Sequence, residues 1–290
     1  MVKILVAFSG GKDSQAALIW AVNHYGRDRV EAVFCDTGWE HTLTYEHIKY
    51  VTNELDVKLV TLRNGSFQDL CRKMKCFPIA SRRACTSNLK VKPMTDYVIS
   101  QNYDVIVIQG IRASESASRA AMVQECSYFS EYFSEDKKNL YRKIDVKEWC
   151  KKHDASVLRP VFRWTAQEVI DYISESGLEV NPLYKRGASR VGCYPCIMSR
   201  LSDIKILAKD KEMLKRVVDL EREIMSIQER GESTFFSLGK IPNRFHETRG
   251  HSRPTITDIV DYVNRDDAQL DMFEPEEGYS CMSVYHGLCE

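Results

Sequence analysis

The chain has 290 residues, of which 43% are hydrophobic and 28% are charged. That composition supports a buried core and excludes an extended disordered chain. Its 41 Lys and Arg residues balance 41 Asp and Glu residues, so the formal net charge is zero. Nucleic-acid binding through overall positive charge is therefore excluded, although a local basic face is compatible with these numbers.

The first 110 residues predict alternating strands and helices. The expected strands are residues 2–8, 30–35, 57–62 and 103–109, and the expected helices are residues 14–25 and 43–55. This alternation predicts an α/β fold with a doubly wound, Rossmann-like parallel sheet. Right-handed crossovers place the carboxyl ends of the strands, and with them any ligand, at one edge of that sheet.

The residues Ser9-Gly10-Gly11-Lys12-Asp13-Ser14, here called the phosphate loop, follow the first expected strand. Two glycines allow a tight turn whose amides point at one anion, and the next helix adds the positive end of its dipole. The loop differs from a Walker loop. It resembles the PP-loop signature of enzymes that split ATP between the α and β phosphates. We therefore expect ATP with Mg²⁺ here, rather than an ordinary glycine turn.

Further candidate nucleotide-binding residues follow later strands. Asp36 ends the second expected strand, where dinucleotide-binding folds place an acid that binds ribose, and its alternative is a simple turn residue. Gly110 and Arg112 directly follow the fourth expected strand. Arg112 and Arg119 are permanent cations that can hold phosphate or sulfate oxygens in a bidentate way. Their alternative is a solvated helix face with Glu115 as an ion-pair partner.

The pattern changes beyond residue 143. A helix is expected over residues 165–176, with Thr165 and Glu168 spaced as a capping box. A long charged helix is expected over residues 202–229 and a short one over residues 255–262. The long helix is a candidate homodimer face, with a solvated surface as the alternative.

Two units are expected along the chain. Residues 1–200 form the nucleotide-binding α/β domain, and residues 201–290 form a helical C-terminal extension. The acidic stretch 266–278 is expected to be a surface loop that leads to a cysteine-bearing tail.

The ten cysteines require an explanation, because the sequence contains no signal peptide or membrane-spanning segment and predicts a cytoplasmic protein without a membrane partner. Disulfides are disfavoured in that compartment, so clustered cysteines predict metal or redox chemistry. Cys193 and Cys196 form a C-x-x-C knuckle that can present two thiolates to one metal. Cys281 and Cys289 would complete a four-thiolate site for a [4Fe–4S] cluster or Zn²⁺.

Six further segments resemble motifs of the phosphoadenosine phosphosulfate reductase family of PP-loop proteins. They are residues 36–40 (DTGWE), 85–93 (CTSNLKVKP), 110–119 (GIRASESASR), 159–164 (RPVFRW), 181–184 (NPLY) and 190–196 (RVGCYPC). With the phosphate loop, the match spans about residues 1–200. The resemblance implies a PP-loop, HUP-type α/β fold and adenine-nucleotide binding, with Lys90 as a further cation.

The same resemblance bears on the cysteines. The cluster-bearing members of the family favour a [4Fe–4S] cluster over Zn²⁺. They also suggest a second set of ligands, in which Cys85, with or without Cys76, joins Cys193 and Cys196.

Two departures from the family pattern concern its sulfite-releasing members. Their catalytic cysteine lies in a C-terminal Glu-Cys-Gly-like tail, whereas this chain ends Gly287-Leu288-Cys289-Glu290. Adenylylsulfate reductases carry adjacent cysteines at the lysine-helix motif, whereas Ala84 precedes Cys85 here. Both departures weigh against sulfonucleotide reduction and leave nucleotide binding untouched.

Three functional hypotheses follow. In the first, an ATP pyrophosphatase adenylates an unknown acceptor, such as a nucleic acid or a small molecule, for sulfur transfer, with Lys12, Asp13 and Arg112 at the reacting phosphates. In the second, a reductase of adenylylsulfate or its 3′-phosphate uses Cys85 or Cys289 as nucleophile. In the third, the chain is a nucleotide-binding module with a structural metal.

Overall fold

A six-stranded sheet forms the centre of the computed structural model, which describes residues 2–133, 140–228, 231–236 and 238–265. Its strands are β1 Lys3–Ala7, β2 Val30–Asp36, β3 Lys58–Arg63, β4 Val105–Gln109, β5 Glu125–Ser127 and β6 Ala155–Leu158. The spatial order is β3-β2-β1-β4-β6-β5. Every neighbouring pair is parallel except β5 with β6, which is antiparallel. The predicted α/β fold with a doubly wound parallel sheet is thereby confirmed.

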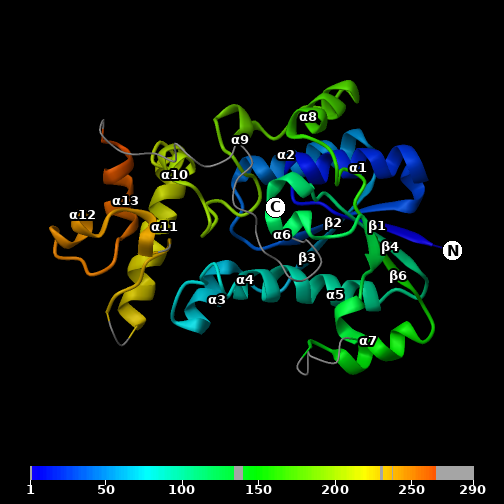
Figure 1. Cartoon of the computed structure of the whole chain (residues 1–290), viewed down its shortest axis with the longest axis horizontal. Coiled ribbons are helices and arrows are strands. Elements are labelled where there is room, and N and C mark those ends of the chain that lie inside the picture. Colours follow the sequence, from blue (N-terminus) through cyan, green and yellow to red (C-terminus); the bar gives the residue numbers. More distant parts are fainter. Residues whose placement is uncertain (1, 134–139, 229–230, 237, 266–290) are drawn as a thin grey trace.

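Helices cover both faces of the sheet (Figure 1). Helices α1 Lys12–Tyr25, α2 Thr42–Glu54 and α8 Ala166–Glu175 lie on one face, and α5 Lys92–Ile99 and α7 Lys143–Cys150 lie on the other. Successive side chains of β1 point to opposite faces of the sheet, so they pack against different groups of helices. Ile4 and Val6 belong to the hydrophobic cluster that includes α1, whereas Leu5 belongs to the cluster that includes α5 and α7.

The other helices are shorter or lie at one end of the sheet. The α-helices are α3 Phe67–Met74, α4 Ala84–Thr86, α6 Ala117–Ala120, α9 Pro182–Lys185, α10 Leu201–Leu207, α11 Lys211–Ile227, α12 Asn243–Glu247 and α13 Ile256–Val263. Four 3₁₀ turns lie at η1 Arg27–Arg29, η3 Ala113–Glu115, η4 Ser130–Phe133 and η5 Leu238–Lys240, and one π turn lies at η2 Ser87–Val91. Within the described residues, no helix is long and apolar enough to cross a membrane.

The elements predicted from the sequence are found with small shifts at their ends, and Thr165 caps α8 in the predicted capping box. Strands β5 and β6 were missed because they have only three and four residues. The single helix predicted over residues 202–229 is wrong, since α10 and α11 are separate. Asp210 interrupts the helix because it caps the start of α11. Its carboxylate accepts from the Met213 amide at 3.1 Å and lies 2.9 Å from the His41 Nε2.

The C-terminal helices share a core with the end of the sheet. One hydrophobic cluster joins Trp39 and Phe67 to residues of α10, α11 and α13 and to the buried pair Phe235 and Phe236. This cluster contains residues from both sides of position 200. The division of the chain at that residue therefore stays a prediction.

Candidate nucleotide site and cysteine pocket

The phosphate loop lies at the point where the strand order reverses. β1 lies between β2 and β4, so the segments that follow β1 and β4 leave the sheet side by side. In doubly wound folds this edge is where ligands bind. Gly110, directly after β4, touches the start of α1: a Cβ there would lie 2.4 Å from the backbone of Asp13 and Ser14. Only glycine fits that approach.

The phosphate loop is braced from within. Gly10 has a φ of +82°, and a Cβ on it would meet Thr44 of α2 at 3.0 Å. The Ser14 hydroxyl donates to the Gly11 carbonyl at 2.9 Å and lies 3.2 Å from the Ser9 hydroxyl. The two serines of the phosphate loop therefore fix the shape of the loop that opens α1.

A buried ion pair links the loop to the segment after β4. The Arg112 Nε donates to the Asp13 carboxylate at 2.5 Å, and both side chains are only 3% exposed. Lys12 donates to the other oxygen of the same carboxylate at 3.0 Å. Asp13 thus holds two cations at the phosphate loop, which is where a nucleotide would bring negative charge.

Arg119 and Asp36, two further predicted nucleotide ligands, make contacts within the protein. Arg119 is buried and forms an ion pair with Glu115, whose carboxylate also accepts from the Arg112 amide at 3.0 Å. The ion pair that the sequence offered as the alternative role of Arg119 is thus present. Asp36 ends β2, where its carboxylate accepts from the Gly38 amide at 2.8 Å and the Tyr45 hydroxyl at 2.7 Å. It braces the turn after β2.

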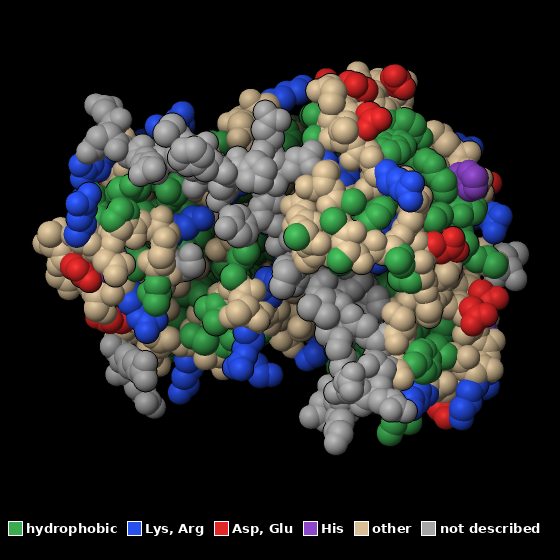
Figure 2. All heavy atoms as spheres, viewed as in Figure 1, with side chains coloured by type: hydrophobic (Ala, Val, Ile, Leu, Met, Phe, Trp, Pro, Cys, Tyr) green, Lys and Arg blue, Asp and Glu red, His purple; other side chains and the backbone are tan. Residues whose placement is uncertain are grey.

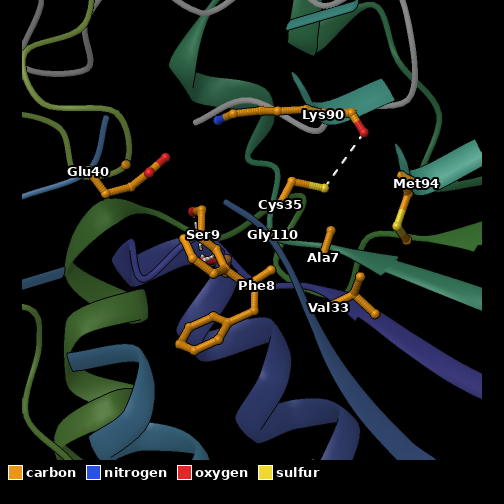
Figure 3. A pocket seen from close by; sticks show the side chains of 12 residues that line it. Ala7, Phe8, Ser9, Val33, Cys35, Glu40, Lys90, Met94 and Gly110 are labelled. Atoms are coloured by element: carbon orange, nitrogen blue, oxygen red, sulfur yellow. Dashed lines mark hydrogen bonds between the residues drawn. The ribbon is translucent and has the colours of Figure 1, made fainter. Parts of the chain in front are cut away.

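A pocket of about 510 Å³, counting its open mouth, lies beside the phosphate loop and is here called the loop pocket. Its walls include Ser9, Ser14 and Gly110 and the end of β2 at Cys35. In Figure 3 the side chains of Lys90 and Glu40 extend toward one another above Ser9. The pocket therefore joins the three segments that the parallel sheet brings to one edge.

Two residues of the NPLY segment hold the phosphate loop from outside, and sequence reasoning missed this role. The amide of Asn181, which is fully buried, donates to the Gly10 carbonyl at 3.3 Å. The Tyr184 hydroxyl accepts from the Lys12 amide at 3.2 Å, and the Lys12 ammonium lies 5.5 Å from the Tyr184 ring centroid. The family motif was the only signal, and it gave no role.

The cysteine knuckle packs against the segment after β2. The Tyr194 amide donates to the Trp39 carbonyl at 2.8 Å, and the Trp39 indole donates to the Pro195 carbonyl at 3.0 Å. Two motifs that lie about 150 residues apart in the sequence are thereby joined. Burial raises the pKa of the Cys193 thiol well above its ordinary value, so in this structure Cys193 is a neutral thiol.

Cys85, Cys193 and Cys196 line one pocket, here called the cysteine pocket. Arg83, Lys90 and Arg190 line it as well. Lys90 also lines the loop pocket, so the two pockets adjoin through this residue.

The three thiols of the cysteine pocket are chemically suited to bind a metal, but they are not close enough together to hold one ion. Three thiols facing one pocket are the ligands that iron–sulfur clusters and zinc prefer. Among the described residues, however, no three Cys, His, Asp or Glu side chains stand close enough together to hold one ion. The predicted ligands Cys281 and Cys289 lie outside the described residues.

Residues 3–199 match the family model of the phosphoadenosine phosphosulfate reductase domain. The chain belongs to this family. A 37.8 kDa uncharacterised protein of Escherichia phage 186 is 28% identical over 99% of this chain and 96% of its own length. An uncharacterised Methanocaldococcus jannaschii protein is 30% identical over 71% of this chain, which spans only 38% of that relative. The adenosine 5′-phosphosulfate reductase of Streptomyces coelicolor is 26% identical over 58% of this chain and 61% of its own length.

Two solved structures show a more distant likeness. The phosphoadenylyl-sulfate reductase of Candida auris, in a phosphate complex, has a TM-score of 0.45 and 15% identity over 67% of this chain and 82% of its own. The U34-tRNA thiolase of Methanococcus maripaludis, with its [4Fe–4S] cluster, has a TM-score of 0.41 and 16% identity over 78% of this chain and 73% of its own. At these low TM-scores and identities, the two structures support no conclusion about the chemistry of this site.

The contact at Gly110 gives the first testable prediction. We expect Gly110→Ala to destabilise the fold by about 2 kcal/mol or more, because the added methyl overlaps the backbone of α1. It should also weaken ATP binding at least tenfold by displacing the phosphate loop. Thermal unfolding and calorimetric titration measure the two effects.

Gly239→Ala is the matched control, since a Cβ there meets nothing within 4 Å and the φ is −82°. Unchanged melting temperature and ATP affinity in Gly110→Ala would contradict the close approach of β4 to α1.

Proposed function

We propose that this chain binds ATP with Mg²⁺ at the phosphate loop and cleaves it between the α and β phosphates, adenylating an acceptor for sulfur transfer. An acceptor atom would attack the α phosphorus, the bond from that phosphorus to the bridging oxygen would break, and pyrophosphate would leave. The observation that carries the proposal is the buried arrangement of Lys12, Asp13 and Arg112 at the start of α1.

Each part of the phosphate loop has a role in this proposal. The amides at the start of α1 and the hydroxyls of Ser9 and Ser14 would bind the departing pyrophosphate. Lys12 and Arg112 would neutralise the charge that develops as the α–β bond breaks. Asp13 acts as a positioning residue, because its carboxylate already holds both cations. Mg²⁺ would enter with the substrate, as part of the ATP–Mg²⁺ complex.

The cysteine pocket would serve the sulfur chemistry. Cys193, Cys196 and Cys85 are the described residues that would hold a [4Fe–4S] cluster or Zn²⁺, with a tail cysteine or Cys76 as the fourth ligand. A bound cluster would supply iron sites for handling sulfur, whereas zinc would brace the knuckle. Lys90 would keep a positive charge between this pocket and the nucleotide.

A second candidate function is the thiol-dependent reduction of adenylylsulfate or its 3′-phosphate. The position of Cys85, in a pocket that adjoins the loop pocket through Lys90, favours it. In that reaction the Cys85 thiolate would attack the sulfate sulfur and release the adenosine phosphate. A nucleotide-binding module without turnover is the third candidate.

Product analysis separates the three candidates. We expect the purified protein to convert ATP slowly to AMP and pyrophosphate, with water in place of the acceptor, and Lys12→Ala to bind ATP at least tenfold more weakly. Lys49→Ala, which removes an exposed cation from α2, should behave as the wild type.

Other products would assign other functions. ADP with phosphate would contradict the cleavage site, and sulfite from a sulfonucleotide would support the reductase. Binding without turnover of any nucleotide would leave only the module. Unchanged ATP affinity in Lys12→Ala would remove the assignment of the loop itself.

Cysteine variants test the metal site. After anaerobic purification, we expect Cys193→Ser and Cys85→Ser to lose most bound iron or zinc, as measured by elemental analysis, because both thiols face the same pocket. Cys150→Ser, on the distant helix α7, should keep it. Full metal content in Cys85→Ser together with its loss in a Cys281→Ser, Cys289→Ser variant would assign the tail pair instead. Full metal content in Cys193→Ser would exclude both ligand sets.

A further inference from the structure

A larger hollow, here called the basic groove, opens next to the cysteine pocket. It has a volume of about 1890 Å³, counting the solvent at its open side. The end of α3, the segment 76–82, the start of α10 and the residues 233–236 and 238–240 form its walls. Ile197 lines both the basic groove and the cysteine pocket, so the two hollows share a wall. The groove is therefore adjacent to the proposed site of sulfur chemistry.

The lining of the basic groove carries charge of one sign. Arg82, Arg200, Lys240 and Arg253 line it, and none of its described lining residues is Asp or Glu. Within the described part of the chain, neither Arg82 nor Arg253 forms an ion pair. Because the whole chain has zero formal charge, this accumulation is local. Three of the four cations are Arg, whose planar guanidinium suits phosphate oxygens.

The floor of the basic groove is apolar. Phe77, Phe235 and Phe236 line it and pack on one another, with ring centroids 5.1 and 4.9 Å apart. At its rim Ile79 and Leu238 are 59% and 49% exposed. The three Phe side chains are at most 5% exposed, so the apolar contacts open to a ligand are those of Ile79 and Leu238. Cations beside exposed apolar side chains match a chain that alternates phosphates with flat bases. A duplex would present phosphates alone to this floor, because its bases are stacked inside.

Figure 2 shows a similar excess of positively charged side chains on the molecular surface. Over the end of the molecule formed by α10 to α13, Lys and Arg side chains are more frequent on the visible face than Asp and Glu. The charge of the groove favours a polyanion.

We propose that the basic groove binds a single-stranded nucleic acid, RNA or DNA, and that this strand is the acceptor. The proposal rests on the adenylation proposed above and names its substrate class. The loop pocket, the cysteine pocket and the basic groove adjoin in series through Lys90 and Ile197. A strand bound in the groove would thus lie beside the cysteine pocket. Only that pocket would separate it from a nucleotide in the loop pocket.

Binding of fluorescent oligonucleotides of about 12 nucleotides tests the proposal, since known single-strand sites cover about 4–16 nucleotides. Anisotropy titrations with the full chain would compare RNA, DNA strands and duplex at two salt concentrations. We expect the double variant Arg82→Glu, Arg253→Glu to bind single strands at least tenfold more weakly than the wild type, with a smaller salt dependence. The strand that binds more tightly shows whether the groove prefers RNA or DNA.

Matched variants separate this inference from the proposed function. Lys49→Glu with Lys147→Glu makes the same change in net charge at exposed sites far from the groove and should leave strand binding within twofold. The groove variant should keep its ATP affinity, and Lys12→Ala should keep its strand affinity. A wild-type protein that binds the strand but not ATP would thus count against the proposed function and leave the groove assignment standing.

Three results would overturn the groove assignment. The first is wild-type strand affinity in the groove variant, and the second is duplex binding as tight as single-strand binding. The third is displacement of the strand by an equal concentration of a peptide of residues 266–278, which contain six acids, because that would assign the groove to an acidic peptide.

Discussion

The ion pair between Asp13 and Arg112 joins the start of α1 to the segment after β4, and the organisation of the site depends on it. Both side chains are buried, so loss of Asp13 would remove the counter-charge that Arg112 and Lys12 share, at a cost of about 3–5 kcal/mol. The pair is possible because Gly110 lets the segment after β4 touch the backbone of α1. One close contact between the segment after β4 and the start of α1 thereby places Arg112 beside Lys12 at the phosphate loop.

The same edge of the sheet organises the rest of the molecule. The segment after β2 carries Trp39, on which the cysteine knuckle and the C-terminal helices both pack. Lys90 closes the loop pocket on one side and the cysteine pocket on the other. The loop pocket, the cysteine pocket and the basic groove therefore adjoin in one molecule, which is the arrangement that the proposed adenylation and sulfur transfer would require.

Much of this arrangement could be predicted from the sequence, because local patterns determine it. Long apolar runs marked β1 to β4, and the glycine turn marked the phosphate loop. Contacts between distant segments could not be predicted. Asn181 and Tyr184 hold the loop across about 170 residues, and Cys85 meets the knuckle only in the folded chain. The break between α10 and α11 was missed because Asp210, as a polar residue, fits an exposed helix face as well as a cap.

Competitive binding of nucleotides tests the central claim, that the site is built for ATP. One anaerobic, metal-intact preparation of the full chain would be titrated by calorimetry with ATP–Mg²⁺, adenylylsulfate and its 3′-phosphate. The proposed function predicts that ATP–Mg²⁺ binds at least tenfold more tightly than either sulfonucleotide, because the phosphate loop is placed to bind a departing pyrophosphate. Tighter binding of a sulfonucleotide would contradict it and make the chain a candidate reductase.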